Sequence, residues 1–306
     1  MNKGWKWFWH ITVALLVLAL LLGIYGLIQA RSLGFLRTPV YETVRPQLPT
    51  LPRPAVLVFY KTNSFIHKQA IPSANQLLDD LAKEHGWSVY ISENGAVHNP
   101  QDLAQFDVLA WNNVTGDVLD AAQRAAMRAW LEQGGGFIGL HAAGDGSHDA
   151  WPWYQDAVIR ARFTGHPIEP QLQQATIKTV PRADPIIAGL PAAWVRKDEW
   201  YSFESSLRSA TTSILATIDE SSYVPGSFFG TQLAMGDDHP MIWKHCVKQG
   251  RARYFAMGHT AHSYAEPEYR ELLQRAIAWA GRLQDGNTSS AWPQALDCEA
   301  PRASSE

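Results

Sequence analysis

Residues 134–145 constrain the fold of this chain more than any other stretch. The residues before them, 120–133, place apolar side chains at helical spacing, which predicts a helix with one apolar face. The three glycines that follow end such a helix, because glycine adopts the left-handed cap conformation without strain. Residues 137–140 then predict a short buried strand, and the small residues after it allow a sharp turn that presents His141 and Asp145.

Strands and helices alternate on the N-terminal side of this stretch. Residues 55–60 form a continuous apolar run, which is typical of a strand buried on both faces, and residues 71–85 have helical spacing. Residues 87–91 and 106–111 are further candidate strands. This order predicts a mostly parallel sheet with helices on its faces. Ligands bind at the carboxyl ends of such strands, so His141 stands where a functional residue is expected, unless local hydrogen bonds alone explain it.

The pattern is looser in the second half of the chain. The aromatic residues 151–154 predict a surface-facing turn, and residues 198–203 a strand or loop edge. Four more strands and a final helix are expected at residues 171–180, 214–218, 241–247, 251–257 and 267–283. Residues 284–306 are polar and small, which predicts a disordered tail.

Composition excludes several classes of protein. The formal net charge of −3 gives no electrostatic case for binding nucleic acid. The two cysteines, Cys246 and Cys298, are too few for a Cys-rich zinc module. They allow one disulfide, provided that the domain is exported. No run resembles a Walker loop or a dinucleotide fingerprint.

The N-terminus predicts a membrane anchor. Residues 1–10 form a short tail, and residues 11–30 contain no charged side chain. Twenty helical residues span roughly 30 Å, the thickness of a hydrocarbon core. Trp5, Trp7 and Trp9 stand where an aromatic belt belongs. A cleaved signal peptide is the rival, but its apolar core usually has about 7–15 residues, so the length favours an uncleaved anchor.

The charges that flank this segment bear on its orientation. Lys3 and Lys6 precede it and Arg31 and Arg37 follow it, so the positive-inside signal nearly cancels. The short basic tail favours a cytoplasmic N-terminus and a domain on the periplasmic or extracellular side. Residues 31–54 are rich in proline, which predicts an extended, semi-rigid linker that holds the domain away from the membrane.

Histidines and acids recur at the expected strand ends. His67 follows the first strand, His141 the fourth and His259 a late one, so the three can converge on one cleft. Together with Asp145 and Glu199 they have the chemistry of general acids and bases or of metal ligands. Each histidine taken singly is explained as well by a structural role. No tight metal spacing such as His-Glu-x-x-His occurs, so a divalent metal would be held by residues from distant loops.

Residues 139–143 have the strand-to-turn placement of a nucleophile elbow. His141 stands where a serine or cysteine nucleophile would be. Cys246 lies in an expected strand, where a cysteine usually packs in the core. The chain is therefore not expected to be a glutaminase or another acyl-transfer enzyme.

Several separated motifs resemble one known family. They are Ser64-Phe65-x-His67, Trp111-Asn112-Asn113-x-Thr115-Gly116-Asp117, the glycine-rich run to Asp145, Phe163-x-x-His166-Pro167, Asp198-Glu199-Trp200-Tyr201-x-Phe203, His239-Pro240-x-x-Trp243 and Gly258-His259-x-x-x-x-Tyr264. In this order they resemble the ThuA-like (trehalose-utilisation) family over about residues 55–283. Ile66 departs from the pattern, because the family often has a basic residue there.

The resemblance implies a fold and a field of function. The fold would be flavodoxin-like, as in class I glutamine amidotransferases: a three-layer α/β sandwich with a mostly parallel sheet, here preceded by one N-terminal transmembrane helix. The family is associated with trehalose and with 3-keto-glycosides made by partner dehydrogenases. A carbohydrate ligand and a sugar dehydrogenase partner are therefore implied.

These considerations assign roles to ten residues. His141 and Glu199 are the acid/base candidates, and Asp145 would orient His141. The side chains that would line the pocket are His67, His166, His239, His259, Asn113, Trp200 and Tyr201, with the histidines as candidate ligands of a divalent metal. Trp243 is a further candidate for stacking on a sugar.

Two other interpretations stay open at this stage. The domain can be a non-catalytic carbohydrate-binding or accessory module tethered to the membrane. It can also be an amidotransferase-like scaffold that serves only for protein contacts.

Overall fold

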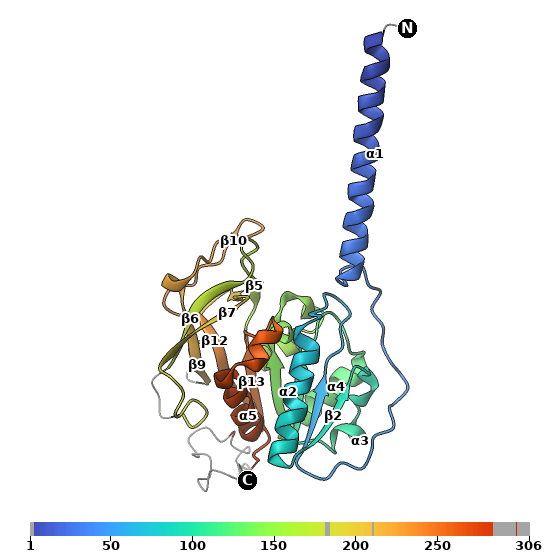
Figure 1. Cartoon of the computed structure of the whole chain (residues 1–306). Helices are drawn as coiled ribbons and strands as arrows, with labels where there is room; N and C mark the ends of the chain where they lie inside the picture. The colour runs from blue at the N-terminus through green and yellow to red at the C-terminus, as the bar shows by residue number, and fades with distance from the viewer. Residues whose placement is uncertain (1–2, 181–183, 210, 284–297, 299–306) are drawn as a thin grey trace.

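A single sheet of nine strands organises the domain (Figure 1). The structure is a computed structural model that describes residues 3–180, 184–209, 211–283 and 298. The strands lie in the order β2-β1-β3-β4-β13-β12-β9-β6-β7. The first five are parallel: β2 (Ser88–Ser92), β1 (Ala55–Phe59), β3 (Val108–Asn112), β4 (Gly136–Leu140) and β13 (Gly250–Phe255). The rest pair antiparallel: β12 (Pro240–Val247), β9 (Thr212–Asp219), β6 (Gln173–Thr179) and β7 (Ala193–Asp198).

Helices cover both faces of the parallel half. The connection through α2 (Ala70–His85) runs from β1 to β2, and the one through α4 (Ala121–Glu132) runs from β3 to β4 in the opposite direction across the sheet. Because such crossovers are right-handed, the two helices lie on opposite faces. Figure 1 shows α5 (Pro267–Ala280) beside α2. The result is a mixed α/β fold, consistent with the flavodoxin-like arrangement that was expected.

Short elements complete the chain. They are α3 (Pro100–Leu103), η1 (Gly95–Val97), η2 (His141–Gly144), η3 (Gly146–His148), η4 (Tyr154–Ile159), η5 (Glu220–Ser222) and η6 (Ala261–Ala265). Two small antiparallel pairs join β5 (Phe163–Gly165) to β8 (Ser202–Phe203) and β10 (Ser227–Phe228) to β11 (Thr231–Gln232).

The expected elements of the core are confirmed apart from shifts at their ends. Helix α4 begins where predicted, because Asp120 and Gln123 form a capping box at its first turn. The predicted surface turn at residues 151–154 is wrong. Tyr154 is buried and starts the π-helical turn η4, and its hydroxyl donates to the carbonyl of Ala143 at 2.6 Å. A tyrosine can be buried in this way when its hydroxyl finds a partner.

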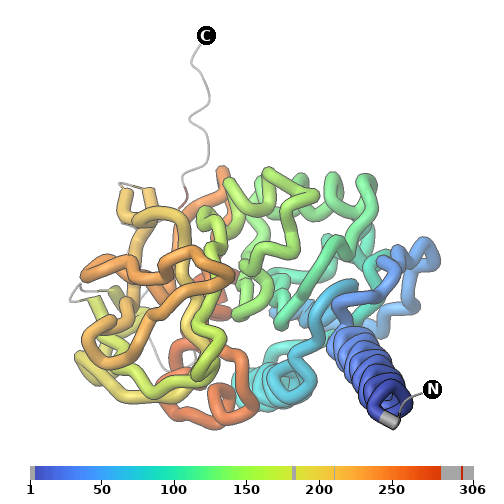
Figure 2. Tube along the Cα trace, turned by 90° about the horizontal axis from the view of Figure 1, so that it is seen from above, coloured from blue at the N-terminus to red at the C-terminus, as the bar shows by residue number. Residues whose placement is uncertain are grey.

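The N-terminal helix α1 (Lys3–Ser32) stands out from the domain (Figure 1). Its stretch Gly4–Ser32 is long and apolar enough to cross a membrane, and none of the most apolar part is buried. A signal sequence meets the same criterion. Seen from above, α1 lies at the margin of the domain (Figure 2).

The chain packs on the domain as soon as α1 ends. The amide of Ile66 donates to the carbonyl of Leu33 at 2.9 Å, and the rings of Phe35 and Phe65 lie 5.3 Å apart. Gly34 has φ +95°, and a Cβ there would lie 2.0 Å from a backbone oxygen of the same loop, so this close approach requires glycine. The loop that α1 meets is the one that carries His67.

Residues 31–54 therefore do not form the free linker that their composition predicted. The segment is extended, as predicted, but it runs along the domain (Figure 1). Glu42 pairs with Lys61, and Arg45 pairs with Asp102. Lys61 and Asp102 are buried, and a buried charge needs such a partner. The segment is thus part of the folded unit.

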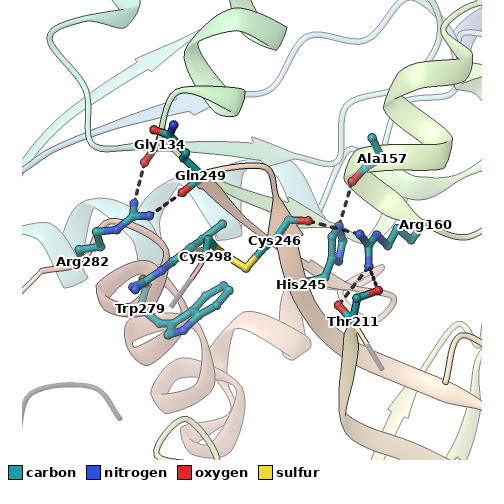
Figure 3. The surroundings of a disulfide bond; sticks show 11 residues. Gly134, Ala157, Arg160, Thr211, His245, Cys246, Gln249, Trp279, Arg282 and Cys298 are labelled. Carbon is teal, nitrogen blue, oxygen red and sulfur yellow. Dashed lines mark hydrogen bonds between the residues drawn. A yellow bond between two sulfur atoms is a disulfide. The ribbon is translucent and has the colours of Figure 1, made fainter. Parts of the chain in front are cut away.

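Cys246 and Cys298 form a disulfide, which was the pairing considered for an exported domain (Figure 3). Cys246 is half-buried in β12, and Trp279 of α5 lies beside the bridge. The rest of the predicted disordered tail, residues 284–297 and 299–306, lies outside the described residues.

A buried histidine makes the stability of this fold depend on pH. Burial lowers the pKa of His98 from 6.5 to about 4, and Trp111 donates to its Nε2 at 3.4 Å. Because the folded pKa is the lower one, the stabilisation is complete above pH 6.5 and is lost as the pH falls toward 4. As the pH falls from 6.5 to 4, the titration of His98 should lower the free energy of unfolding by about 3 kcal/mol.

Urea titrations of the full chain in detergent at several pH values measure this effect. His98→Gln should flatten the slope between pH 6.5 and 4. The matched control is His262→Gln, which changes an exposed side chain and should leave the slope as it is. An unchanged slope in the His98 variant would contradict the assignment.

Candidate functional site

Four side chains that can bind metals or transfer protons meet at the carboxyl end of the parallel strands. His67, His141 and His259 follow β1, β4 and β13, and Glu199 follows β7. One nitrogen or oxygen atom from each lies within 4.8 Å of the corresponding atoms of the other three. We call these four residues the His-Glu cluster. The predicted convergence of the three strand-end histidines is found in the structure.

Three atoms of the cluster form a nearly equilateral triangle. His141 Nε2 and His259 Nδ1 each lie 3.2 Å from Glu199 Oε2, and the two nitrogens are 3.1 Å apart. His67 stands against both other rings, with centroids 5.0 Å from His141 and 4.8 Å from His259. Its Nδ1 is buried and has no hydrogen-bond partner among the described residues.

His141 is held by the turn η2. Its φ is +46°, in the left-handed region that non-glycine residues rarely adopt, so the turn is strained as a functional elbow often is. The hydroxyl of Tyr254 donates to its carbonyl. Its Nδ1 lies 2.9 Å from the carbonyl of Ala256, which can only accept. Nδ1 therefore carries a hydrogen, and Nε2 faces Glu199 Oε2.

The Glu199 carboxylate is almost fully buried, at 2% exposure. Burial raises its pKa, but the hydrogen bonds and charges of His141 and His259 outweigh burial and hold that pKa well below its usual value. Its other oxygen, Oε1, accepts from Gln171 Nε2 and lies 3.3 Å from His166 Nδ1. Glu199 is therefore an anion whose two oxygens serve different partners.

The histidines of the cluster respond to the same burial in different ways. Burial and the neighbouring His141 and His259 lower the pKa of His67 well below its usual value. Burial also acts to lower the pKa of His259, but its hydrogen bond and charge interaction with Glu199 raise the pKa overall. His259 is the ring of the cluster that reaches furthest to the surface, with 17% of its side chain exposed.

A second carboxylate, that of Asp198, fixes the positions of these groups, a role that was not predicted for it from the sequence. Asp198 accepts from the amides of Gly258 and His259 and from the hydroxyl of Ser263, at 2.8–3.0 Å. The guanidinium of Arg196 balances its charge at 2.9 Å, and both side chains are fully buried. Asp198 directly precedes Glu199. Its carboxylate therefore ties the turn of His259 to the segment that carries Glu199. Its place beside Glu199 in the motif was the one available signal.

Two of the other predicted residues lie next to the cluster. The ring of Tyr201 stacks on His141 at 4.2 Å. His166 contacts Glu199 and is partly exposed, so it lies at the margin of the site. His239 is not a member, because its two nitrogens lie 2.7 Å from the carbonyl of Tyr201 and from Glu220. His239 instead helps to position Tyr201, because its Nε2 contacts the carbonyl of that residue.

The structure corrects the roles predicted for three others. The carboxylate of Asp145 accepts from Ser147, while the carbonyl of Ala256 orients His141 in its place. Trp200 and Trp243 are fully buried, so stacking on a sugar does not fit their positions.

Asn113 is buried just beyond β3. It donates to Asn112 and to the hydroxyl of Tyr264 at 2.9 Å. Its Oδ1 has no partner among the described residues. A buried amide oxygen without a partner costs free energy, so it is a candidate for a contact with a ligand or a water molecule.

Breaking the Asp198–Arg196 pair should destabilise the domain strongly. Asp198→Ala leaves the Arg196 charge buried without this partner and frees the amides of Gly258 and His259. We expect the free energy of unfolding, measured in urea, to fall by about 3–5 kcal/mol. Asp219→Ala breaks an exposed pair with Lys178 and should change it little. Equal effects in the two variants would argue against the positioning role.

Comparisons with known proteins identify the family. The family described as "ThuA: Trehalose utilisation" matches residues 55–280. No curated protein matches the chain. A crystal structure of a ThuA-like protein from Bacteroides uniformis has 23% identity and a TM-score of 0.64, and covers 78% of this chain and 95% of its own. Another from Parabacteroides merdae has 17% identity and a TM-score of 0.54, and covers 75% and 90%. These likenesses show the fold, and the family match shows that the chain belongs to the ThuA family.

Proposed function

We propose that this protein is a membrane-anchored enzyme of sugar metabolism that acts on a glycoside or a 3-keto-glycoside at the His-Glu cluster. The observation that carries the proposal is the meeting of three histidines and one buried carboxylate at the ligand-binding edge of the sheet. The trehalose-utilisation family points to sugar metabolism as the field of function. The family match names no reaction, so the reaction is inferred from the residues.

The residues suit proton transfer at a sugar. In a 3-keto-glycoside the hydrogen on C2 lies beside a carbonyl, and its removal by a base lets the bond from C1 to the leaving oxygen break. The leaving oxygen then takes up a proton. His141 and Glu199 are the acid/base candidates at the centre of the site, and His166 at its margin can pass a proton to or from Glu199 Oε1, 3.3 Å away. The ring of Tyr201 stacks on His141 and restricts how a ligand can approach that ring.

Turnover by the full chain in detergent tests this proposal. The substrates are a panel of glycosides and 3-keto-glycosides, with product measured by chromatography. Glu199→Gln keeps the size of the side chain and should lower kcat at least about 100-fold. His262→Ala alters an exposed histidine and should retain activity.

The outcomes separate this proposal from its main rival. Full activity in the Glu199 variant would exclude chemistry at the cluster. Sugar binding without product from any substrate would favour a tethered carbohydrate-binding module.

The proposed anchor would place the site next to the bilayer. Leu33 and Phe35, just after α1, contact the loop that carries Phe65, and the ring of Phe65 lies 4.8 Å from that of His67. A disulfide persists in oxidising compartments, which supports a domain on the periplasmic or extracellular side.

Intact mass spectrometry of the protein isolated from washed membranes tests the anchor. We expect the mass to include residues 1–30, because the apolar segment is longer than the core of a typical signal peptide. A mature chain that begins after residue 30 would show a cleaved signal peptide.

A further inference from the structure

We propose that His67, His141, His259 and Glu199 bind one divalent first-row transition metal ion. Three nitrogens and one carboxylate oxygen are a common ligand set for such ions. Magnesium and calcium prefer sites made of oxygen atoms, so this set selects against them.

The triangle of ligand atoms has the size of a coordination shell. Ligand atoms about 2.0–2.1 Å from a tetrahedral zinc ion lie about 3.3 Å from one another. The three separations among His141 Nε2, His259 Nδ1 and Glu199 Oε2 are 3.1, 3.2 and 3.2 Å. These atoms therefore match one face of a tetrahedron.

The arrangement of the three rings agrees with this geometry. A coordinated imidazole has its centroid about 3.2 Å from the metal, so three such rings at tetrahedral angles have centroids about 5 Å apart. The centroids of His67, His141 and His259 are separated by 4.8, 5.0 and 5.2 Å. The ring planes lie at 79–89° to one another, so the rings meet edge to face and do not stack.

The orientation of His141 leaves one ring nitrogen for a cation. Its Nδ1 lies 2.9 Å from the carbonyl of Ala256, whereas its Nε2 lies beside Glu199 Oε2 and His259 Nδ1. A cation bound there would be shared by these three atoms. The buried Nδ1 of His67 also has no hydrogen-bond partner among the described residues, and a buried polar atom without a partner costs free energy.

The residues around the cluster resemble the outer shell of a metal site. Metal-binding histidines usually donate their other ring N–H to a carbonyl or carboxylate, as His141 does to Ala256. Gln171 holds the second oxygen of Glu199, and Asp198 holds the backbone of His259. Such contacts fix the ligands before the ion binds. With four protein ligands, the ion would polarise a sugar carbonyl only as a fifth ligand, and proton transfer would fall to Glu199 Oε1 and His166. These roles rest on the proposed function, whereas the binding of the ion does not.

Metal binding is measured on the full chain in detergent, separately from turnover. Protein stripped with EDTA is titrated with Zn²⁺ and with Co²⁺ by calorimetry, and the Co²⁺ visible spectrum is recorded. We expect one ion per chain. His259→Ala and Glu199→Gln should each weaken binding by more than about 100-fold, because loss of an outer-shell partner alone costs about 10–100-fold.

His262→Ala removes an exposed histidine three residues after His259 and is the matched control. It should leave the affinity and the Co²⁺ spectrum unchanged. Circular dichroism establishes that each variant is folded, and Glu199→Gln, which keeps its shape, covers the case in which His259→Ala does not fold. The inference would be overturned if the folded wild type bound neither ion. It would also be overturned if both cluster variants bound the ion as tightly as the wild type does. Binding without turnover would instead contradict the proposed function.

Discussion

The buried charge of Glu199 is the constraint on which this end of the molecule depends. A carboxylate with so little exposure to water is stable only if paired and hydrogen-bonded. His141 and His259 approach one oxygen and Gln171 approaches the other. Any change that separates these groups leaves a charge in the interior, so the loops that carry them are coupled through that single group.

The fold explains how segments far apart in sequence reach one point. Parallel strands bring the loops of His67, His141 and His259 to the same edge. Glu199 comes from β7, at the opposite border of the sheet. The end of β7 is held near the parallel strands by Arg196. This side chain packs over the ring of Tyr269 in α5 and contacts the sulfur of Met257. The antiparallel half thus supplies the anion, and the parallel half supplies the imidazoles.

The sequence was sufficient for the parts of this arrangement that rest on local patterns. Apolar periodicity predicts α4, and the glycines and small residues around β4 predict the turn that carries His141. Strand-end placement also predicts which histidines converge. Contacts between segments distant in sequence could not be predicted: Asp198 gives no local sign that it accepts from the amides of Gly258 and His259, and Gln171 none that it reaches Glu199.

The predicted stacking role of Trp200 was wrong because the sequence does not show which side chains are buried. Trp200 stands beside Glu199 in the sequence, but its indole N–H donates to the carbonyl of Gln173 inside the domain. Neighbouring residues of an extended segment point to opposite sides, so Tyr201 stacks on His141 while Trp200 packs in the core. The proline-rich linker shows the same limit, because its composition predicts an extended chain but not the surface along which it lies.

The central claim is that the His-Glu cluster is built to hold a cation. Anomalous scattering from crystals of the metal-saturated full chain, recorded at the absorption edge of the bound metal, tests it most directly. The account predicts one peak at the point enclosed by His67, His141, His259 and Glu199, within about 2.4 Å of a nitrogen or oxygen atom of each. A peak at another position, or well-ordered cluster side chains with no peak between them, would contradict it.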